Sequence, residues 1–223
     1  MKRIEAIIFD LDGLMIDTEP LAQQAWDRVL QDHGRKLDEK TFASMIGLRL
    51  EESSIVVRDA FELATSPSEL AKSEQMYMAQ IMEAGIPRMP GLRRLLDEIE
   101  GLKLPWAVAT SSRREYAVHV LDQLDLLKRC QAIVGGDEVD KGKPAPDVYL
   151  LAAKRLDMDP GRCLALEDSV PGINAAATAG MLTVAVPNGD TASGNFEKAA
   201  FVYQSLVEVA YDLENILDRS LLE

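Results

Sequence analysis

Six short apolar runs recur along the chain, and each has the length of one strand of a sheet. The first run ends at Phe9 and is rich in isoleucine, which is typical of a strand buried on both faces of a parallel sheet. Helical patterns separate the later runs. Because strand and helix alternate, we predict an α/β fold with a doubly wound parallel sheet. The predicted strands are Ile4–Phe9, Leu104–Ala109, Gln131–Val134, Cys163–Leu166, Leu182–Val186 and Ala200–Tyr203, and the helices between them are Ser112–Asp125, Asp147–Leu156 and Val170–Gly180.

The alternation is interrupted between Thr18 and Ile86, where no convincing strand occurs. The segment Ser66–Glu69 has the spacing of a capping box, with a proline at the first helical position. We therefore predict a small all-helical cap domain, residues 18–86, inserted after the first strand. The core domain is then formed by residues 1–17 and 87–223. The predicted cap helices run from Pro20 to Gly34, over Asp38–Ile46 and Leu50–Leu63, and from Pro67 to Gly85.

Net charge and hydrophobicity indicate which kinds of molecule the protein can bind. The formal net charge is −13, which argues against nucleic acid because phosphate backbones attract basic surfaces. No apolar stretch is long enough for a spanning helix, so no membrane partner is expected. The first residues lead directly into a strand-like run without a visible signal peptide, and Cys130 and Cys163 are expected to be free thiols. We expect a cytoplasmic protein, either a monomer or a weak homodimer, acting on a small metabolite.

Two carboxylates follow the first predicted strand, where ligands bind in an open α/β sheet. Asp10 and Asp12 are two residues apart, so they point the same way if the chain stays extended, and Gly13 then permits a sharp turn. A hard cation such as Mg²⁺ would relieve their repulsion. The alternative is a loop with two solvated aspartates. Taken alone, the segment Asp10–Gly13 supports a metal site and a solvated loop equally.

Hydroxyls and a lysine lie at two further strand ends. Thr110, Ser111 and Ser112 precede a predicted helix, so their hydroxyls and amides could form a phosphate cradle. The alternative is a helix cap by Ser111 or Ser112, which the local pattern alone favours. Lys143, between a glycine and a proline, could present one compact positive charge to a phosphate. Its alternative is an exposed turn lysine.

The fourth predicted strand is followed by Glu167 and Asp168. Two more carboxylates therefore reach the edge of the sheet where Asp10 and Asp12 already lie. Solvation explains one acidic pair, but it does not explain four acidic residues together with a lysine and hydroxyls at neighbouring strand ends. A metal ion and a phosphate group explain all of them.

Taken together, these motifs resemble those of the haloacid dehalogenase-like superfamily. The matching motifs are Asp10-x-Asp12-Gly13, Thr110-Ser111, Lys143-Pro144 and Glu167-Asp168, in the superfamily's order. The resemblance covers the whole chain and is greatest to the β-phosphoglucomutase-like group of sugar-phosphate phosphatases and mutases. It implies a Rossmann-like core and a helical cap of the C1 type that closes over the site and excludes water.

The resemblance also implies a reaction. Asp10 would attack phosphorus and form an aspartyl phosphate. Asp12 would act as the general acid toward the leaving oxygen and then as the base toward water. The dehalogenase branch lacks an acid at the position of Asp12, so we reject dehalogenation.

Further roles follow from the same resemblance. Mg²⁺ would be held by the Asp10 carboxylate, the backbone carbonyl of Asp12 and Asp168, with Glu167 as a ligand or as the orienting group for a metal-bound water. The phosphoryl oxygens would be bound by Thr110, the Ser111 amide and Lys143. Gly47 and Arg49 lie where this group places a substrate-specificity loop, although Arg49 is equally compatible with an exposed surface position.

Three functions compete. A phosphomonoester phosphatase is the leading hypothesis and a hexose-phosphate mutase the second. Mutases of this group carry a histidine in the first cap helix, where this chain has Ala22, and Lys72 is the only basic residue across Leu70–Ile86. Both observations favour the phosphatase. The third is a non-catalytic phosphoacceptor or binding protein with a receiver-like sheet. The helical insert and Lys143-Pro144 disfavour it, because a receiver has no need of a cap.

Overall fold

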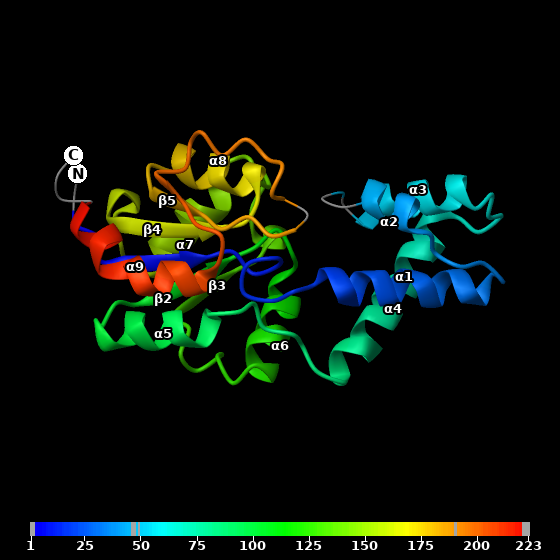
Figure 1. Ribbon diagram of the computed structural model, residues 1–223, viewed down its shortest axis with the longest axis horizontal. Helices are drawn as coiled ribbons and strands as arrows, with labels where there is room; N and C mark the ends of the chain where they lie inside the picture. The colour runs from blue at the N-terminus through cyan, green and yellow to red at the C-terminus, as the bar shows by residue number, and fades with distance from the viewer. Residues whose placement is uncertain (1–2, 46–47, 49, 190, 220–223) are drawn as a thin grey trace. The chain divides into compact units, whose positions relative to one another are not determined.

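A parallel sheet of six strands forms the centre of one compact unit of the chain, residues 1–16 and 88–223 (Figure 1). The computed structural model describes residues 3–45, 48, 50–189 and 191–219. The strand order is β3-β2-β1-β4-β5-β6, so the predicted doubly wound α/β fold is confirmed. Each strand overlaps one predicted run: β1 (Ala6–Phe9), β2 (Trp106–Ala109), β3 (Ala132–Val134), β4 (Cys163–Glu167), β5 (Leu182–Ala185) and β6 (Phe201–Val202).

Burial explains why these runs are apolar. Every residue of the first five strands is buried, which leaves no place for alternating polar side chains. Phe9 and Trp106 pack edge to face on neighbouring strands, with ring centroids 5.8 Å apart. The strands are therefore a rigid platform, and their carboxyl ends hold the residues that follow them in fixed positions.

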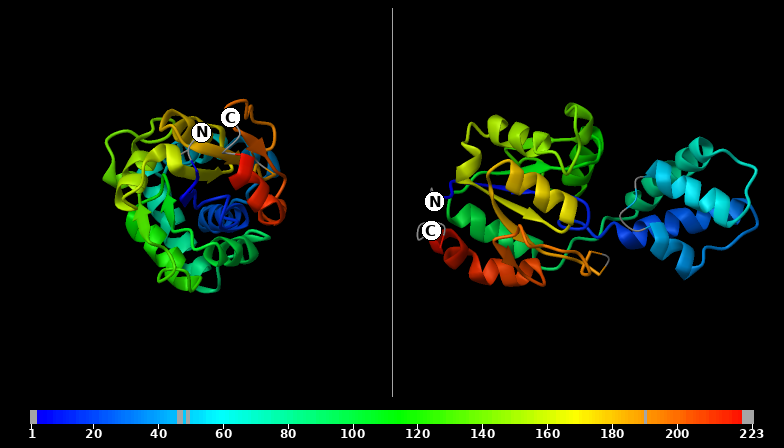
Figure 2. Two further views of the ribbon diagram at one scale, coloured as in Figure 1. Left: turned by 90° about the vertical axis from the view of Figure 1, so that its left-hand side faces the viewer. Right: turned by 90° about the horizontal axis from the view of Figure 1, so that it is seen from above.

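Helices cover both faces of this sheet (Figures 1 and 2). One face carries α7 (Asp147–Arg155) and α8 (Val170–Thr178), while α5 (Leu92–Gly101) and α9 (Leu206–Arg219) pack together on the other. Near the edge strand β3 lies α6 (Arg114–Gln123). Within the described part of the chain, no helix combines the length and the apolar character needed to cross a membrane.

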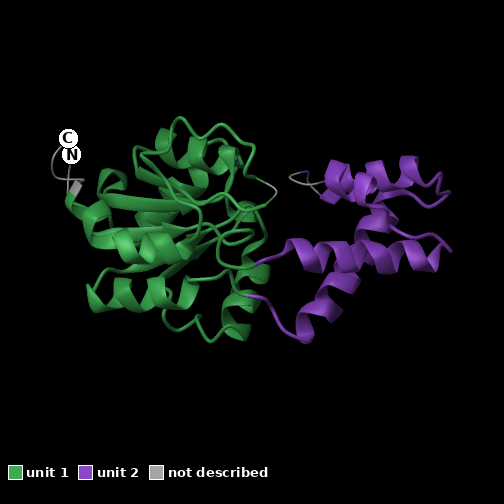
Figure 3. Cartoon of the chain, viewed as in Figure 1, with its two compact units in different colours: residues 1–16, 88–223 green, residues 17–87 purple. Residues whose placement is uncertain are grey.

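The second compact unit, residues 17–87, is helical (Figure 3). Its limits lie one residue from those predicted for the cap domain. The capping box at the start of α4 is present: the Ser66 hydroxyl accepts from the Glu69 amide, and the Glu69 carboxylate accepts from the Ser66 amide. Apolar residues centred on Trp26 and Leu70 form its own core. The helices are α1 (Glu19–Asp32), α2 (Glu39–Met45), α3 (Leu50–Ala60) and α4 (Pro67–Glu83).

One carboxylate is buried in this helical unit. Glu74 is 6% exposed and lies one turn from Leu70 and Tyr77, which belong to or pack against the apolar core. No hydrogen-bond donor among the described residues contacts it. Burial raises its pKa from 4.5 to about 7. The pKa of Glu74 is higher in the folded protein than in the unfolded chain. The protonated Glu74 side chain therefore stabilises the fold fully below pH 4.5, and this contribution is lost as the pH rises through 7.

We therefore expect Glu74→Gln to be more stable than the wild type at pH 8, by up to about 3 kcal/mol, and to lose most of the pH dependence between pH 5 and 8. Urea unfolding followed by Trp26 fluorescence, in a Trp106→Phe background, reports on this unit. Glu83→Gln, an exposed position on the same helix, is the matched control. An unchanged pH slope in Glu74→Gln would contradict the assignment.

Candidate active site

Strand register brings three carboxylates together. Phe9 of β1 pairs with Leu166 of β4, so Asp10 and Glu167 leave adjacent strands at the same level, at the point where the strand order reverses. Asp10, Glu167 and Asp168 offer oxygens within 4.8 Å of one another, and we call these three residues the acidic cluster. Asp10 and Asp168 are each 6% exposed, and Glu167 is fully buried. The alternative of a solvated loop is therefore wrong for Asp10.

Lys143 supplies the positive charge of this cluster. It lies between β3 and α7, and its side chain is only 6% exposed, so the alternative of an exposed turn lysine is wrong. Its ammonium donates to Asp10 Oδ1 at 2.5 Å, to Glu167 Oε1 at 2.6 Å and to the Ala109 carbonyl at 3.1 Å. Burial disfavours the charge, but Asp10 and Glu167 outweigh that effect and raise the pKa of Lys143. Lys143 is therefore a fixed cation.

Glu167 is held from several sides. Its Oε1 accepts from Lys143 and from the Tyr149 hydroxyl at 2.9 Å, and its Oε2 accepts from the backbone amide and the hydroxyl of Ser169 at 3.0 and 2.8 Å. Gly172 makes room, because a Cβ there would lie 1.6 Å from Glu167 Oε1. Both oxygens of the Glu167 carboxylate thus accept hydrogen bonds from the protein, and this carboxylate fixes the Lys143 ammonium in place.

Asp10 and Asp168 have the character of metal ligands. Among the described residues, no side chain donates to Asp10 Oδ2 or to Asp168 Oδ1. Burial raises the pKa of Asp10 well above its usual value, and burial together with Glu167 raises that of Asp168 to about 8. One ammonium does not balance three buried carboxylates. A hard cation bound by these oxygens would restore the balance, so the donor set fits a divalent metal ion.

Asn188 is a site residue that our sequence analysis missed. It lies shortly after β5, and its side-chain amide donates to the Gly13 carbonyl at 3.1 Å and to Asp168 Oδ2 at 3.2 Å. Gly13 has a φ of +82°, and a Cβ there would lie 2.5 Å from Asp168 Oδ2. Asn188 therefore links the turn after β1 to Asp168. Its position beyond a strand's carboxyl end was the signal that could have identified it.

Asp12 lies beside the loop that follows β2, and hydroxyl groups hold its carboxylate. The Ser112 hydroxyl donates to Asp12 Oδ2 at 2.7 Å and the Thr110 hydroxyl to the same oxygen at 3.2 Å. Tyr116, also missed from the sequence, donates to Oδ1 at 2.9 Å. The N-cap residue of helix α6 is Arg113, and its side chain makes no hydrogen bond to the first turn of the helix. The helix-cap alternative for Ser111 or Ser112 is therefore wrong.

The other residues predicted for the site differ in how the structure places them. Ser111 is exposed, and its carbonyl packs against Gly136, where a Cβ would lie 2.3 Å from the carbonyl oxygen. This contact fixes the backbone of the loop after β2. Gly47 and Arg49, predicted for the specificity loop, lie outside the described residues.

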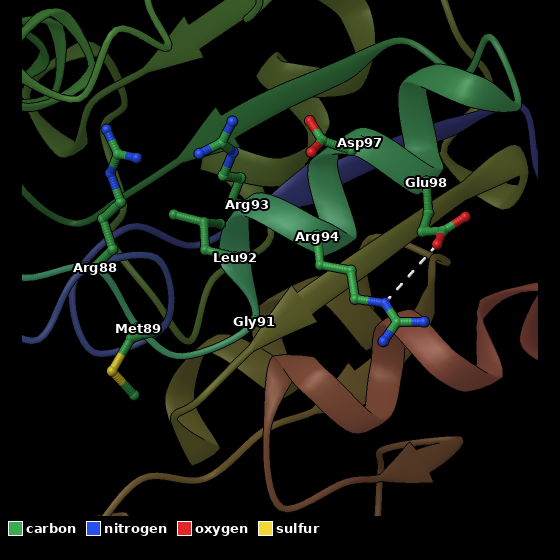
Figure 4. A pocket seen from close by; sticks show the side chains of 8 residues that line it. All are labelled: Arg88, Met89, Gly91, Leu92, Arg93, Arg94, Asp97 and Glu98. Atoms are coloured by element: carbon green, nitrogen blue, oxygen red, sulfur yellow. Dashed lines mark ion pairs between the residues drawn. The ribbon is translucent and has the colours of Figure 1, made fainter.

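A hollow of about 610 Å³ lies at the start of α5, apart from the acidic cluster. Arg88, Arg93 and Arg94 are among its lining residues, and no residue of the acidic cluster is (Figure 4). Arg94 already has partners, since it lies 3.6 Å from the centre of the Tyr211 ring and 3.8 Å from Glu98. We therefore place the candidate active site at the acidic cluster.

The acidic cluster lies at the switch point of a doubly wound sheet, and one buried lysine donates hydrogen bonds to two of its carboxylates. This arrangement defines a site for phosphoryl transfer. Comparison with known proteins gives the same result. The model of the haloacid dehalogenase-like hydrolase family matches residues 7–186. The chain therefore belongs to the haloacid dehalogenase-like hydrolase family, and within it acts as a phosphatase of phosphate monoesters.

Individual relatives match over most of the chain. A phosphorylated carbohydrates phosphatase of Thermotoga maritima is 33% identical over 80% of this chain and 82% of its own. The β-phosphoglucomutase of Bacillus subtilis is 32% identical over 86% of this chain and 87% of its own. The crystal structure of CbbY from Rhodobacter sphaeroides in complex with phosphate has a TM-score of 0.78 at 26% identity, covering 92% of this chain and 96% of that one.

Proposed function

We propose that the chain hydrolyses the monoester of a small phosphorylated sugar through a phosphorylated Asp10. A carboxylate oxygen of Asp10 attacks phosphorus, the bond from phosphorus to the sugar oxygen breaks, and Asp12 gives its proton to that oxygen. Water then attacks the phosphorus of the aspartyl phosphate, Asp12 takes the proton from the water, and phosphate leaves Asp10. The observation that carries this proposal is the pairing of Asp10 with Lys143 inside the acidic cluster.

The residues around Asp10 divide the remaining work. The Ser111 amide and Lys143 bind the phosphoryl oxygens and offset the charge that develops on them. The Thr110 hydroxyl, which we also predicted beside the phosphate, gives its one proton to Asp12. Ser112, which we predicted beside the phosphate, donates to Asp12, so its hydroxyl serves the acid and base group. Glu167 keeps the Lys143 ammonium beside Asp10.

We propose Mg²⁺ as the metal, because its preferred ligands are carboxylate and carbonyl oxygens. Asp10 and Asp168 would hold it through their carboxylates, together with the backbone carbonyl of Asp12. Glu167 would act on it indirectly, because both of its oxygens already accept hydrogen bonds. When bound, the ion supplies positive charge that neutralises the phosphoryl group.

The relatives support the substrate class. The names of the Thermotoga and Bacillus proteins both refer to phosphorylated sugars, and this chain covers most of each. We extend that class, and not a particular sugar, to the present chain. A cytoplasmic location and a monomer or weak homodimer remain predictions from the sequence.

A hexose-phosphate mutase is the second candidate, because the Bacillus relative carries that name. The two functions differ in what accepts the phosphoryl group from Asp10: water, or a second hydroxyl of the sugar. Ala22, where mutases of this group carry a histidine, favours water.

We expect β-glucose 1-phosphate, offered with Mg²⁺ and a trace of the 1,6-bisphosphate, to yield free phosphate and little glucose 6-phosphate. Both products are followed in the same reaction, and EDTA should stop phosphate release. A parallel panel of other sugar phosphates guards against a poor choice of sugar. Rapid formation of glucose 6-phosphate with little free phosphate would favour the mutase.

A further inference from the structure

Three hydroxyl groups surround the carboxylate of Asp12, and they are divided unequally between its two oxygens. Oδ2 accepts from Ser112 at 2.7 Å and from Thr110 at 3.2 Å. Oδ1 accepts from Tyr116 at 2.9 Å. Among the described residues, Tyr116 is the only side chain that donates a hydrogen bond to Oδ1.

This division bears on where Asp12 carries a proton. A protonated carboxyl group holds its proton on one oxygen, and that oxygen gives up acceptor capacity. Oδ2 already accepts two hydrogen bonds, so a proton there would displace at least one of them. Oδ1 has one hydrogen-bond partner in the described part of the chain, and a phenol can accept as well as donate. Oδ1 is therefore the oxygen that can exchange a proton while the Ser112 and Thr110 contacts remain.

Tyr116 is itself held in place. It lies in the first turn of α6 (Arg114–Gln123), and the Arg114 amide donates to Asp137 Oδ1 at 2.8 Å. Gly135 packs against the same turn, because a Cβ there would lie 2.2 Å from the Arg114 nitrogen. The start of α6 is thus fixed to the loop after β3, and this fixes the direction from which the Tyr116 hydroxyl reaches Asp12.

We propose that Tyr116 is a positioning residue that holds Oδ1 of Asp12 as the oxygen that protonates the leaving group. The inference rests on the proposed function, in which Asp12 is the general acid. It assigns distinct tasks to the hydroxyls: Ser112 and Thr110 anchor Oδ2, and Tyr116 aligns Oδ1.

The test uses the leaving group. An alkoxide is a poor leaving group and needs a proton as it departs, whereas 4-nitrophenolate leaves without one. Since kcat/KM reports only the steps up to departure of the leaving group, we compare it for an alkyl phosphate and for 4-nitrophenyl phosphate. Tyr116→Phe should lower kcat/KM for the alkyl ester about 10- to 100-fold and that for the nitrophenyl ester less than about 3-fold.

Two further variants distinguish a wrong role for Tyr116 from a wrong acid role for Asp12. Asp12→Asn should show the same preference for the nitrophenyl ester, and more strongly. Tyr211→Phe, at an exposed site outside the acidic cluster, should change neither substrate. An equal loss on both esters, or no loss on either, in Tyr116→Phe would overturn the role of Tyr116. Absence of the preference in Asp12→Asn would instead overturn the acid role of Asp12.

Discussion

Asp10→Asn should abolish turnover and leave the fold intact. An amide has nearly the shape of the carboxylate, and its oxygen can still accept the hydrogen bond from Lys143, which is 2.5 Å away in the wild type. An amide does not act as the nucleophile, so no aspartyl phosphate forms. We expect kcat to fall at least about 10⁴-fold, as when a nucleophile is removed from other enzymes with covalent intermediates. Phosphate release under saturating substrate measures the loss, and thermal unfolding checks the fold.

Asp122→Asn is the matched control, because Asp122 is an exposed aspartate of α6 outside the site. It should retain wild-type turnover. Acid quenching during turnover, followed by mass spectrometry, should find the phosphoryl group on the peptide that contains Asp10 in the wild type and in Asp122→Asn, but not in Asp10→Asn. A folded Asp10→Asn variant with near-normal turnover would show that another residue attacks phosphorus.

The sheet could be predicted from sequence because five of its six strands are buried along their whole length, and only the edge strand β6 is partly exposed. Buried strands need continuous apolar residues, and such runs stand out from the helices between them. Two helices of the core were missed, α5 and α9, although α5 buries Leu92, Leu95, Leu96 and Ile99 at helical spacing. They follow the cap insert and the last strand, where the simple alternation of strand and helix gives no guide.

The acidic cluster could be predicted for a related reason. Parallel strands bring their carboxyl ends to one edge, so residues after β1 and β4 meet wherever they lie in the chain. Asn188 follows β5 and could have been found by the same argument, although its sequence does not show that it reaches Gly13 and Asp168. Tyr116 and Tyr149 could not be identified in this way, because they lie within helices and their contacts with Asp12 and Glu167 depend on how those helices are placed. Nothing in their local sequence distinguishes these two tyrosines from packing residues.

The second large effect is expected at Lys143, whose ammonium is shared between Asp10 and Glu167. Lys143→Met fills much of the same space and removes the charge, which leaves two buried carboxylates without their cation. Breaking a buried ion pair on one side costs about 3–5 kcal/mol, so the variant should unfold at a clearly lower urea concentration. Turnover should fall by at least about 10²-fold, because the phosphoryl oxygens lose their fixed positive charge.

The stability loss in Lys143→Met should depend on pH in a definite direction. Burial already raises the pKa of Asp10, and without Lys143 no cation opposes that effect. A carboxyl group with a raised folded pKa stabilises the fold at low pH and loses that contribution as the pH rises through the folded pKa. The deficit relative to the wild type should therefore be smaller at pH 5 than at pH 8. Lys143→Arg retains the charge and should show little of this dependence. A deficit that is the same at both pH values in Lys143→Met would mean that lost packing, and not the unpaired carboxylates, causes the destabilisation.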